Sequence, residues 1–478
     1  MDSSAPRIPW LIALIPFAVL VALQALVIQR FGSDAIDGAS QTVLLFAAGV
    51  AVAIAMIFYK VPWKRIDGAI GDNIRTIGPA VLILFLIGAI SGSWMMSGVV
   101  PTMIYYGMQI LTPSLFLFMA CIICALVSLI TGSSWTTVAT VGIALIGIGT
   151  AHGFPVGWTA GAIISGAYFG DKISPLSDTT VLASSVGEVP LFKHIRYMLI
   201  TTVPSFTIAL VIFLVVSLNH TVTAGDQALS FAEGLQNSFV ISPWLLLVPL
   251  FTGVLIALRL PAAVILFLSA LMAGIVMLFV QPEIVAHIGD GDQFRGIMLT
   301  YFSSTSIDTG NEALSSLVQT RGMKGMLSTV FLIFCASAFG GALTGGGMMQ
   351  SLTSALARGI SGRRSLVTST VATGLFSNMA TGDQYLSIVL TGNIFKQLYR
   401  DKGFEGRLLS RSTEDSATVT SVLVPWNTCG MTQSTVLKVP TLDYLPYCFF
   451  NLISPLMSIT IAFIGYKIFR QPKEAAEQ

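Results

Sequence analysis

The chain has 478 residues, of which 54% are apolar and only 10% are charged, and its formal net charge is +2. Soluble domains carry about 25% charged residues. This chain therefore has too few charges to cover a water-facing surface, and much of that surface must face lipid. A near-neutral chain without a basic stripe is not expected to bind nucleic acid. We expect a multi-pass protein of the inner (plasma) membrane, in contact with the lipid bilayer.

Apolar runs that are long enough, or nearly long enough, to span a membrane follow one another along the chain. In order they cover residues 8–28, 42–59, 77–96, 114–130, 138–149, 156–169, 195–218, 241–258, 260–280, 327–343, 366–379, 385–395, 419–425 and 444–469. A spanning segment must satisfy its backbone hydrogen bonds internally, so these runs predict about eleven to thirteen helical membrane segments. The fold class is therefore an all-α polytopic membrane protein.

Lysine and arginine in short loops predict the orientation of the helices. The basic segments 60–75, 193–196, 396–411 and 467–473 are expected in the cytoplasm, whereas loops 219–240 and 282–293 carry acids but no lysine or arginine and are expected outside. The short charged turns at 321–324 and 358–364 do not fit this scheme. The topology of the second half stays open at this point.

A weak internal repeat is visible in the sequence. The motif TGSSW at 131–135 is matched by TGDQY at 381–385, and each follows a Gly/Met-rich stretch. Each also precedes an acidic, hydroxyl-rich stretch, at 170–180 in the first half and at 411–421 in the second. The shared order predicts a duplicated fold, and repeats with interrupted helices at matching positions are typical of secondary transporters.

The repeat divides the chain into five expected regions. These are N-terminal membrane helices at 1–76, a first transport repeat at 77–219, linking helices at 220–325, a second transport repeat at 326–470 and a short tail at 471–478.

The segment 166–187, GAYFGDKISPLSDTTVLASSVG, interrupts a membrane segment. Gly170 and Pro175 break the helix, and backbone without helical partners survives at membrane depth only inside protein or beside a wet cavity. Asp171, Lys172 and Asp178 lie in this interruption. A charge inside a membrane is costly, so these residues are candidates for function.

This segment offers the oxygen ligands that a hard cation such as Na⁺ prefers. A carboxylate in a poorly hydrated site holds a proton or a cation but rarely both, which is the physical basis of antiport. We expect Lys172 to compensate the charge of Asp171 when the site is empty. A structural Asp171–Lys172 pair that caps a cytoplasmic loop is the alternative. The expected Na⁺ ligands are Asp178, Ser174 and Asp171, with Thr179 beside them.

The second half offers further cation- or proton-binding candidates. Glu414 and Asp415 lie in its acidic stretch, and Asn427 follows a second break at Pro425. Since Arg407 and Arg411 come just before, the two acids could instead be ordinary first-turn acids of a helix.

The motifs TGSSW and TGDQY are expected to be tips between short apolar runs, in re-entrant hairpins or broken spans. Their polar groups would face the breaks from the other side. The candidates at the tips are Thr131, Ser134 and Asp383.

Residues 166–185 and 409–430 resemble the NhaC family of sodium/proton antiporters, and the similarity covers nearly the whole chain. The resemblance implies two inverted repeats, each with a re-entrant hairpin and a broken helix, in which the two acidic stretches are the broken helices. It also implies a homodimer with a scaffold domain and a moving, elevator-like transport domain. The family form DTTNLA reads DTTVLA here, so Val181 removes one possible amide ligand.

These observations favour a secondary active transporter that exchanges Na⁺ for H⁺ by alternating access. Some relatives exchange organic anions such as malate and lactate, so a Na⁺/H⁺-coupled exchanger of small organic acids or amino acids is the alternative. An enzyme is not expected, because the sequence contains neither GxSxG nor HExxH. We expect no catalytic residues and no cofactor; Na⁺ and H⁺ are the transported ions.

Overall fold

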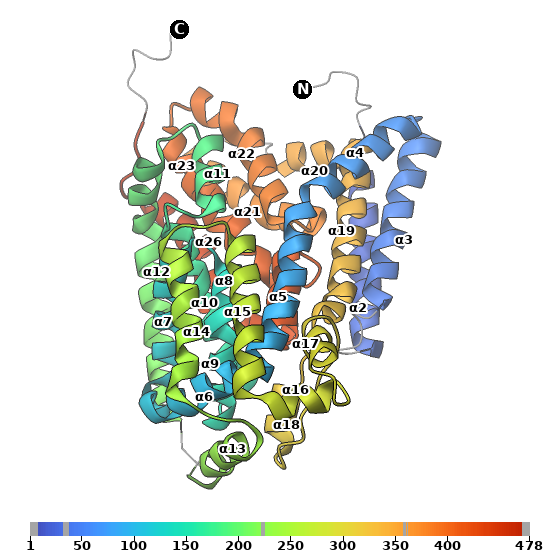
Figure 1. Ribbon diagram of the computed structural model, residues 1–478. Helices are drawn as coiled ribbons and strands as arrows, with labels where there is room; N and C mark the ends of the chain where they lie inside the picture. The colour runs from blue at the N-terminus through green and yellow to red at the C-terminus, as the bar shows by residue number, and fades with distance from the viewer. Residues whose placement is uncertain (1–7, 32–37, 221–224, 357–359, 361, 471–478) are drawn as a thin grey trace.

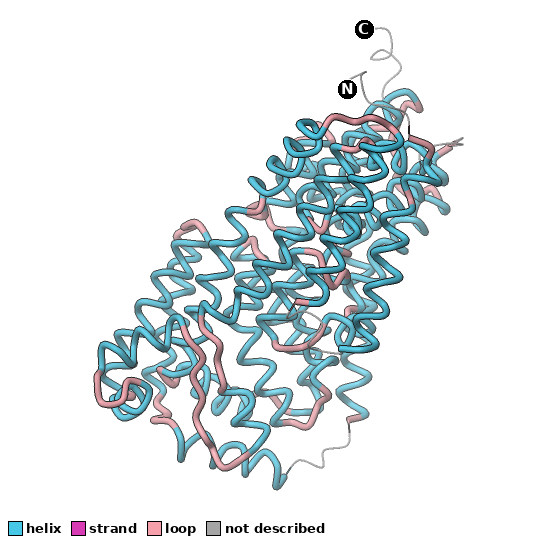
Figure 2. Tube along the Cα trace, turned by 90° about the vertical axis from the view of Figure 1, so that its right-hand side faces the viewer, coloured by secondary structure: helices cyan, strands magenta, loops and turns pink. Residues whose placement is uncertain are grey.

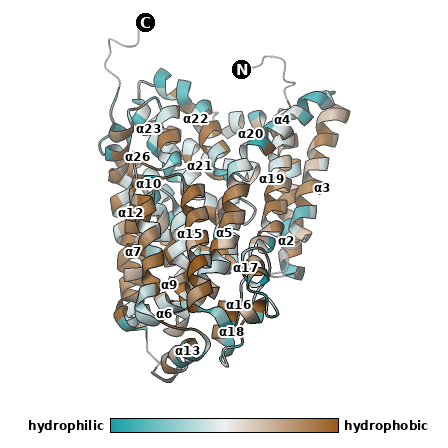
Figure 3. Cartoon of the chain, viewed as in Figure 1, coloured by the Kyte–Doolittle hydropathy of each residue, from teal (hydrophilic) through white to brown (hydrophobic). Residues whose placement is uncertain are grey.

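The computed structural model describes residues 8–31, 38–220, 225–356, 360 and 362–470, and throughout these ranges the regular elements are helices (Figure 1). The expected tail at 471–478 lies outside the described residues. Most of the helices follow one long axis of the molecule (Figure 2). Apolar residues dominate their middle, and hydrophilic residues gather toward the two ends (Figure 3). This pattern is the one that a bilayer imposes.

Eight helices of the described chain are long and apolar enough to cross a membrane. Two bent pairs, Leu229–Ser238 with Pro243–Ala257 and Thr441–Tyr447 with Phe449–Ile464, raise the number to ten. Three further helices that the sequence also counted, α10 (Val156–Ile173), α21 (Arg363–Thr381) and α22 (Gln384–Asp401), have 18 or 19 residues but are more polar. The eight single spans cover Trp10–Phe31, Ala39–Phe58, Trp63–Met96, Pro113–Thr131, Ser134–Ala151, Leu191–Asn219, Ala262–Val280 and Met323–Gly345.

The two ends of the molecule carry different loops. Helices α4 (Trp63–Thr76), α22 and α23 (Gly406–Thr413) lie at the upper end in Figure 1, and α13 (Gly225–Ser238), α16 (Pro282–Ile288) and α18 (Glu312–Val318) lie at the lower end. The basic segments and the acidic loops thus lie at opposite ends. The turn at 321–324, which follows α18, joins the acidic loops at the lower end, while residues 362–364 lie at the upper end.

Two hairpins have the same construction 250 residues apart. The first hairpin comprises α7 (Phe116–Thr131), α8 (Ser134–Thr137), a π turn and α9 (Ile143–Ala151), and the second comprises α21 and α22. Each tip turns at a glycine with left-handed backbone, Gly132 (φ 67°) and Gly382 (φ 65°), a conformation that costs other residues more. The first hairpin enters from the lower end and the second from the upper end (Figure 1), so the repeats are inverted.

Each hairpin packs against a broken helix through the same contact. Ser128 Oγ donates to the carbonyl of Ala167 (2.6 Å), and 250 residues later Asn378 Nδ2 donates to the carbonyl of Ala417 (2.7 Å). Gly166 lies next to this contact, where a Cβ atom would come within 2.1 Å of the Cys121 carbonyl. Helices α7 and α10 therefore touch closely.

The broken helices also match. The first consists of α10 and α11 (Asp178–Val186), and the second consists of α23 with a π turn at Glu414–Thr418, followed by α24 (Thr428–Leu437). The residues just before α11 and α24, Ser177 and Asn427, cap them with their side chains, as is common at helix starts.

The prolines of the two breaks, Pro175 and Pro425, are also 250 residues apart. This spacing corrects one expectation. The structural equivalent of 170–180 is 420–430, whereas the acidic stretch 411–421 precedes the second break.

The closing helices of the two repeats, α12 (Leu191–Asn219) and α26 (Phe449–Ile464), pack against each other. Outside this centre, α3 (Ala39–Ala53) packs on α19 (Leu327–Gly345), and α15 (Ala262–Val280) packs on α5 (Gly78–Met96). The two hairpin tips are thereby held at the middle of the molecule.

Candidate cation-binding site

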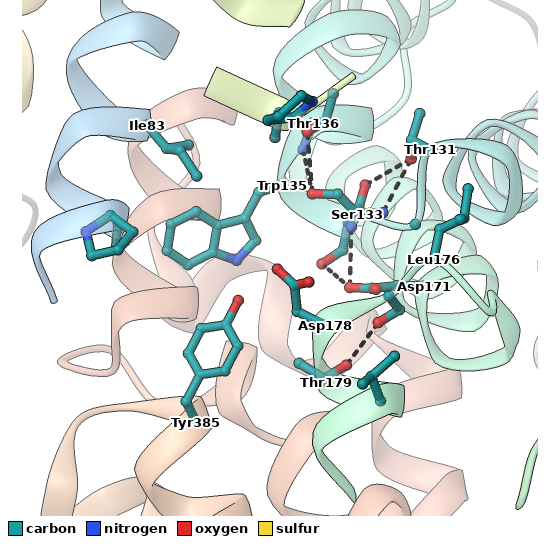
Figure 4. Close-up of a pocket in the computed structure, with 18 of the residues that line it drawn as sticks. Ile83, Thr131, Ser133, Trp135, Thr136, Asp171, Leu176, Asp178, Thr179 and Tyr385 are labelled. Carbon is teal, nitrogen blue, oxygen red and sulfur yellow. Dashed lines mark hydrogen bonds between the residues drawn. The ribbon is translucent and has the colours of Figure 1, made fainter. Parts of the chain in front are cut away.

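A cavity of about 920 Å³ lies where the two hairpin tips meet α11 (Figure 4). Its volume is in the range of small-molecule sites. Its lining comes from both repeats. It includes the tip of each hairpin and the first residues of α11 and α24, the helices that follow the two breaks. The polar side chains of the lining are those of Thr76, Thr131, Ser133, Ser134, Trp135, Thr136, Asp171, Ser177, Asp178, Thr179, Ser185, Arg259, Asp383, Gln384, Tyr385 and Thr428.

Asp171 is a buried carboxylate at the end of α10. Its Oδ2 accepts two hydrogen bonds from Ser134 at the first hairpin tip, from the backbone N–H (3.1 Å) and from Oγ (2.8 Å). The residues expected at the break and at the tip are thus in direct contact. These donors hold the carboxylate at the wall of the cavity.

Asp178 is the first residue of α11, and its side chain is exposed to the cavity. Figure 4 shows its carboxylate between the rings of Trp135 and Tyr385. Unlike Asp171, it has no hydrogen-bond donor among the side chains and amides of the described residues. Its oxygens are therefore free to bind a cation.

Asp383 occupies the tip of the second hairpin. One oxygen caps α22 by accepting from the N–H of Leu386 (2.9 Å), and the other accepts from the Thr428 hydroxyl (3.4 Å). The side chain is 4% exposed. Asp383 therefore has a structural role as a cap and also brings a third carboxylate to the cavity.

The carboxylates alternate between the repeats. At three pairs of positions 250 residues apart, one repeat carries an acid and the other a hydroxyl group. The pairs are Ser133 with Asp383, Asp171 with Ser421, and Asp178 with Thr428. Five of these six residues line the cavity. The duplicated scaffold thus surrounds one space with carboxylate and hydroxyl oxygens, which suit a hard cation.

Of the three other uncharged candidates, only Thr179 lines the cavity, whereas Ser174 and Asn427 lie beside it. Ser174 lies outside the lining, and its Oγ donates to the carbonyl of Leu129 (2.8 Å). Thr179 lines the cavity and donates to Glu414 Oε1 (3.3 Å). Asn427 caps α24, and its Nδ2 donates to the carbonyl of Asn378 (3.1 Å). Ser174 and Asn427 therefore shape the breaks around the cavity.

Lys172 does not pair with Asp171, which corrects both expectations for this lysine. It crosses to the second repeat, where Nζ forms an ion pair with Asp415 Oδ1 and donates to Ser454 Oγ (2.9 Å). The same Asp415 oxygen accepts from the Thr201 hydroxyl (3.0 Å). Lys172 does compensate an acid, but that acid belongs to the other broken helix.

Lys172, Arg411, Glu414 and Asp415 form a buried charge cluster, in which every residue is 0% exposed. Glu414 and Asp415 begin the π turn that continues α23, a helix that starts at Gly406, so they do not lie at a free helix N-terminus. Arg411, which the charge pattern placed at the end of a cytoplasmic segment, is equally buried, with Nε 3.8 Å from Asp415 Oδ2. None of the four residues lines the cavity.

Among the cavity residues that the sequence candidates did not include are Thr428, Tyr385 and Arg259. The sequence does contain a signal for Thr428, because this residue lies 250 positions after Asp178, the spacing of the repeat. Tyr385 is the last residue of the TGDQY motif, so the motif itself indicated its position near the hairpin tip. Arg259 gives no such signal, since it lies in the turn between α14 (Leu247–Ala257) and α15, far from either repeat motif.

Comparison with known proteins agrees with this architecture. Residues 166–466 match the model of the Na⁺/H⁺ antiporter family. The chain is 37% identical over 422 residues to the Na⁺/H⁺ antiporter NhaC of Bacillus subtilis, covering 88% of this chain and 91% of that protein. The chain belongs to the NhaC family of Na⁺/H⁺ antiporters.

Other relatives of this NhaC family member carry different names. The malate-2H⁺/Na⁺-lactate antiporter of Bacillus subtilis is 35% identical, covering 84% of this chain and 85% of that protein. The arginine/ornithine antiporter ArcD of Halobacterium salinarum is 33% identical, covering 98% and 94%. The NhaC family member is thus a multi-pass membrane transporter whose relatives include antiporters of both inorganic and organic ions.

Proposed function

We propose that the protein exchanges Na⁺ for H⁺ across the plasma membrane, with Na⁺ bound in the cavity between the hairpin tips. The observation that carries this proposal is the convergence of three carboxylates, Asp171, Asp178 and Asp383, on one cavity. Asp171 and Asp178 are the proposed Na⁺ ligands on the first repeat. Ser134 and Thr131 at the tip supply neutral oxygens, and Thr179 beside Asp178 also lines the cavity.

Exchange follows from competition for the same oxygens. A carboxylate that binds Na⁺ must be ionised, and a protonated one has lost the charge that attracts the cation. The cavity therefore holds Na⁺ or protons, and each of them shifts the protein toward the conformation that binds it better. Transport in an elevator-like movement would carry the hairpin tips and broken helices together, because their hydrogen bonds join them into one unit.

The accessibility of the cavity supports a state that is open to the cytoplasm. Its lining reaches Thr76, the last residue of α4, at the end of the molecule that carries the basic segments. The positive-inside rule assigns that end to the cytoplasm. The exposed Asp178 carboxylate would then be the first ligand that a cytoplasmic Na⁺ ion meets.

Reconstituted vesicles test the proposal. A Na⁺ gradient should drive a pH change reported by an entrapped dye, and D178N should reduce its rate at least about tenfold, since one ligand charge is removed. The matched control is D67N, which removes an exposed acid on the outer face of α4. Undiminished exchange by D178N would refute the assigned role of Asp178.

A second candidate function is exchange of small organic acids or amino acids coupled to Na⁺ and H⁺. The size of the cavity and the presence of Arg259 in its lining favour this alternative, because an arginine can bind a carboxylate. Counterflow of radiolabelled malate, lactate, arginine or ornithine distinguishes the two functions. Organic counterflow without Na⁺-driven proton movement would favour the alternative.

We further propose that the protein assembles as a homodimer, as the family resemblance implies, and that transport is its activity rather than catalysis. Crosslinking in the membrane followed by mass measurement tests the assembly. A purely monomeric species would contradict it.

A further inference from the structure

Glu414, a residue of the buried charge cluster, lies next to the cavity with one carboxyl oxygen that has no hydrogen bond. Glu414 Oε1 accepts from Thr179, while Glu414 Oε2 is buried with no hydrogen-bond partner. A buried polar atom without a partner is rare and calls for a physical explanation. A proton on the carboxyl group would neutralise it and reduce the cost of its burial.

One side chain separates Glu414 from the cavity. Thr179 lines the cavity and donates to Glu414, and its hydroxyl oxygen lies 3.0 Å from Ser177 Oγ, which also lines the cavity. Figure 4 shows Thr179 below Asp171, with this hydrogen bond drawn as a dashed line. A hydroxyl group can accept one proton while it gives up another. Thr179 and Ser177 thus form a continuous path from Glu414 to the cavity.

We propose that Glu414 carries a transported proton at a site separate from the Na⁺ cavity and releases it through the hydroxyl groups of Thr179 and Ser177. In this step the Thr179 hydrogen points to Ser177, and Thr179 Oγ1 accepts the proton from Glu414 Oε1. Thr179 gives its own proton to Ser177 Oγ, and Ser177 passes one into the cavity. Glu414 gains one negative charge, and the cavity gains one proton. The inference rests on the proposed Na⁺/H⁺ exchange.

Charge balance in the cluster explains why Na⁺ would trigger this release. With Glu414 ionised, the two cations Lys172 and Arg411 balance the two acids, and with Glu414 protonated the cluster carries one net positive charge. Asp171, the carboxylate proposed to bind Na⁺, is the chain neighbour of Lys172 and therefore lies beside the cluster. When Na⁺ neutralises Asp171, nearby negative charge is lost, so the excess positive charge of the cluster costs more. Loss of the Glu414 proton restores the balance.

Calorimetry of Na⁺ binding to the full-length protein in detergent tests the inference. Titrations in buffers of different ionisation enthalpy count the protons released per bound Na⁺. We expect E414Q to lower this number by up to one proton and E414D to restore it. If wild-type protein binds no Na⁺, the proposed function fails; if E414Q binds Na⁺ and releases as many protons as wild type, the separate proton site fails.

A kinetic measurement tests the path even if E414Q does not fold. Stopped-flow mixing with Na⁺ and a pH dye should show proton release slowed at least tenfold in T179V, which keeps Glu414 but removes the hydroxyl group. The matched control is T413V, which removes a neighbouring buried hydroxyl group without a hydrogen-bond partner and should release protons at the wild-type rate. An unchanged rate in T179V overturns the path.

Discussion

Lys172 forms an ion pair with Asp415 of the second repeat, although its chain neighbour Asp171 faces the Na⁺ cavity. Consecutive residues of a helix point in different directions, so the end of α10 contacts the cavity on one side and the buried charge cluster on the other. The ion pair therefore joins the two broken helices behind the site, where cation and proton binding can influence each other.

Removing Lys172 should destabilise the protein, because K172M leaves Asp415 as a buried acid with only the more distant Arg411 to balance it. We expect a loss of about 3 kcal/mol, the lower end for broken buried pairs, measured as thermal unfolding in detergent. The double variant K172M/D415L should recover part of this loss. The control K396M breaks an exposed pair with Glu188 and should lose less than about 1 kcal/mol. Equal losses for K172M and K396M would contradict the structural role.

Two substitutions should distinguish the role of Asp383 as a helix cap from its role as a charged ligand. D383N keeps a side-chain oxygen that can cap α22, so its thermal stability should stay close to that of the wild type, while its KM for Na⁺ rises by about tenfold because a charged ligand is lost. D383A also loses the cap and should be less stable by about 1 kcal/mol. If D383N binds Na⁺ as the wild type does, Asp383 is a cap alone.

Arg259 should weaken the attraction of the cavity for Na⁺, because its positive charge lines the same space as the three carboxylates. R259Q should lower the KM for Na⁺ by about two- to fivefold at low ionic strength, and the difference should shrink when choline chloride is added, since salt screens exposed charges. R295Q, which changes an exposed arginine beside Asp290, serves as the control. A raised KM for Na⁺ in R259Q would show that Arg259 assists cation binding instead.

Labelling should place the turn at 321–324 on the opposite side of the membrane from α4. The five native cysteines are buried, so an impermeant maleimide should react mainly with an introduced thiol. Lys64 and Arg321 are both exposed, and K64C and R321C should react from opposite sides of oriented vesicles. Reaction from the same side would overturn the arrangement of the second half.

Much of the architecture could be predicted from the sequence, because it depends on local patterns. The apolar runs indicated the spans, Pro175 indicated the first break, and the TG motifs indicated the hairpin tips. Gly170 was expected to break the helix too, but it lies inside α10, where its lack of a side chain allows close contact with α7. The acidic stretches indicate the wrong register for the second broken helix, whereas the 250-residue spacing of Pro175 and Pro425 indicates the right one. Pro175 and Pro425 share a backbone role, whereas the acids in the two halves have different roles.

The sequence by itself determined that this chain crosses the membrane many times, has two related halves and places carboxylates beside broken helices. These properties follow from composition, helix-breaking residues and spacing, which act within a segment. Only the tertiary structure decided which acid pairs with Lys172, which carboxylates share the cavity and which lie behind it. Those relationships join residues more than 200 positions apart, and they depend on how inverted repeats pack, because side-chain direction is fixed only once each helix has its neighbours.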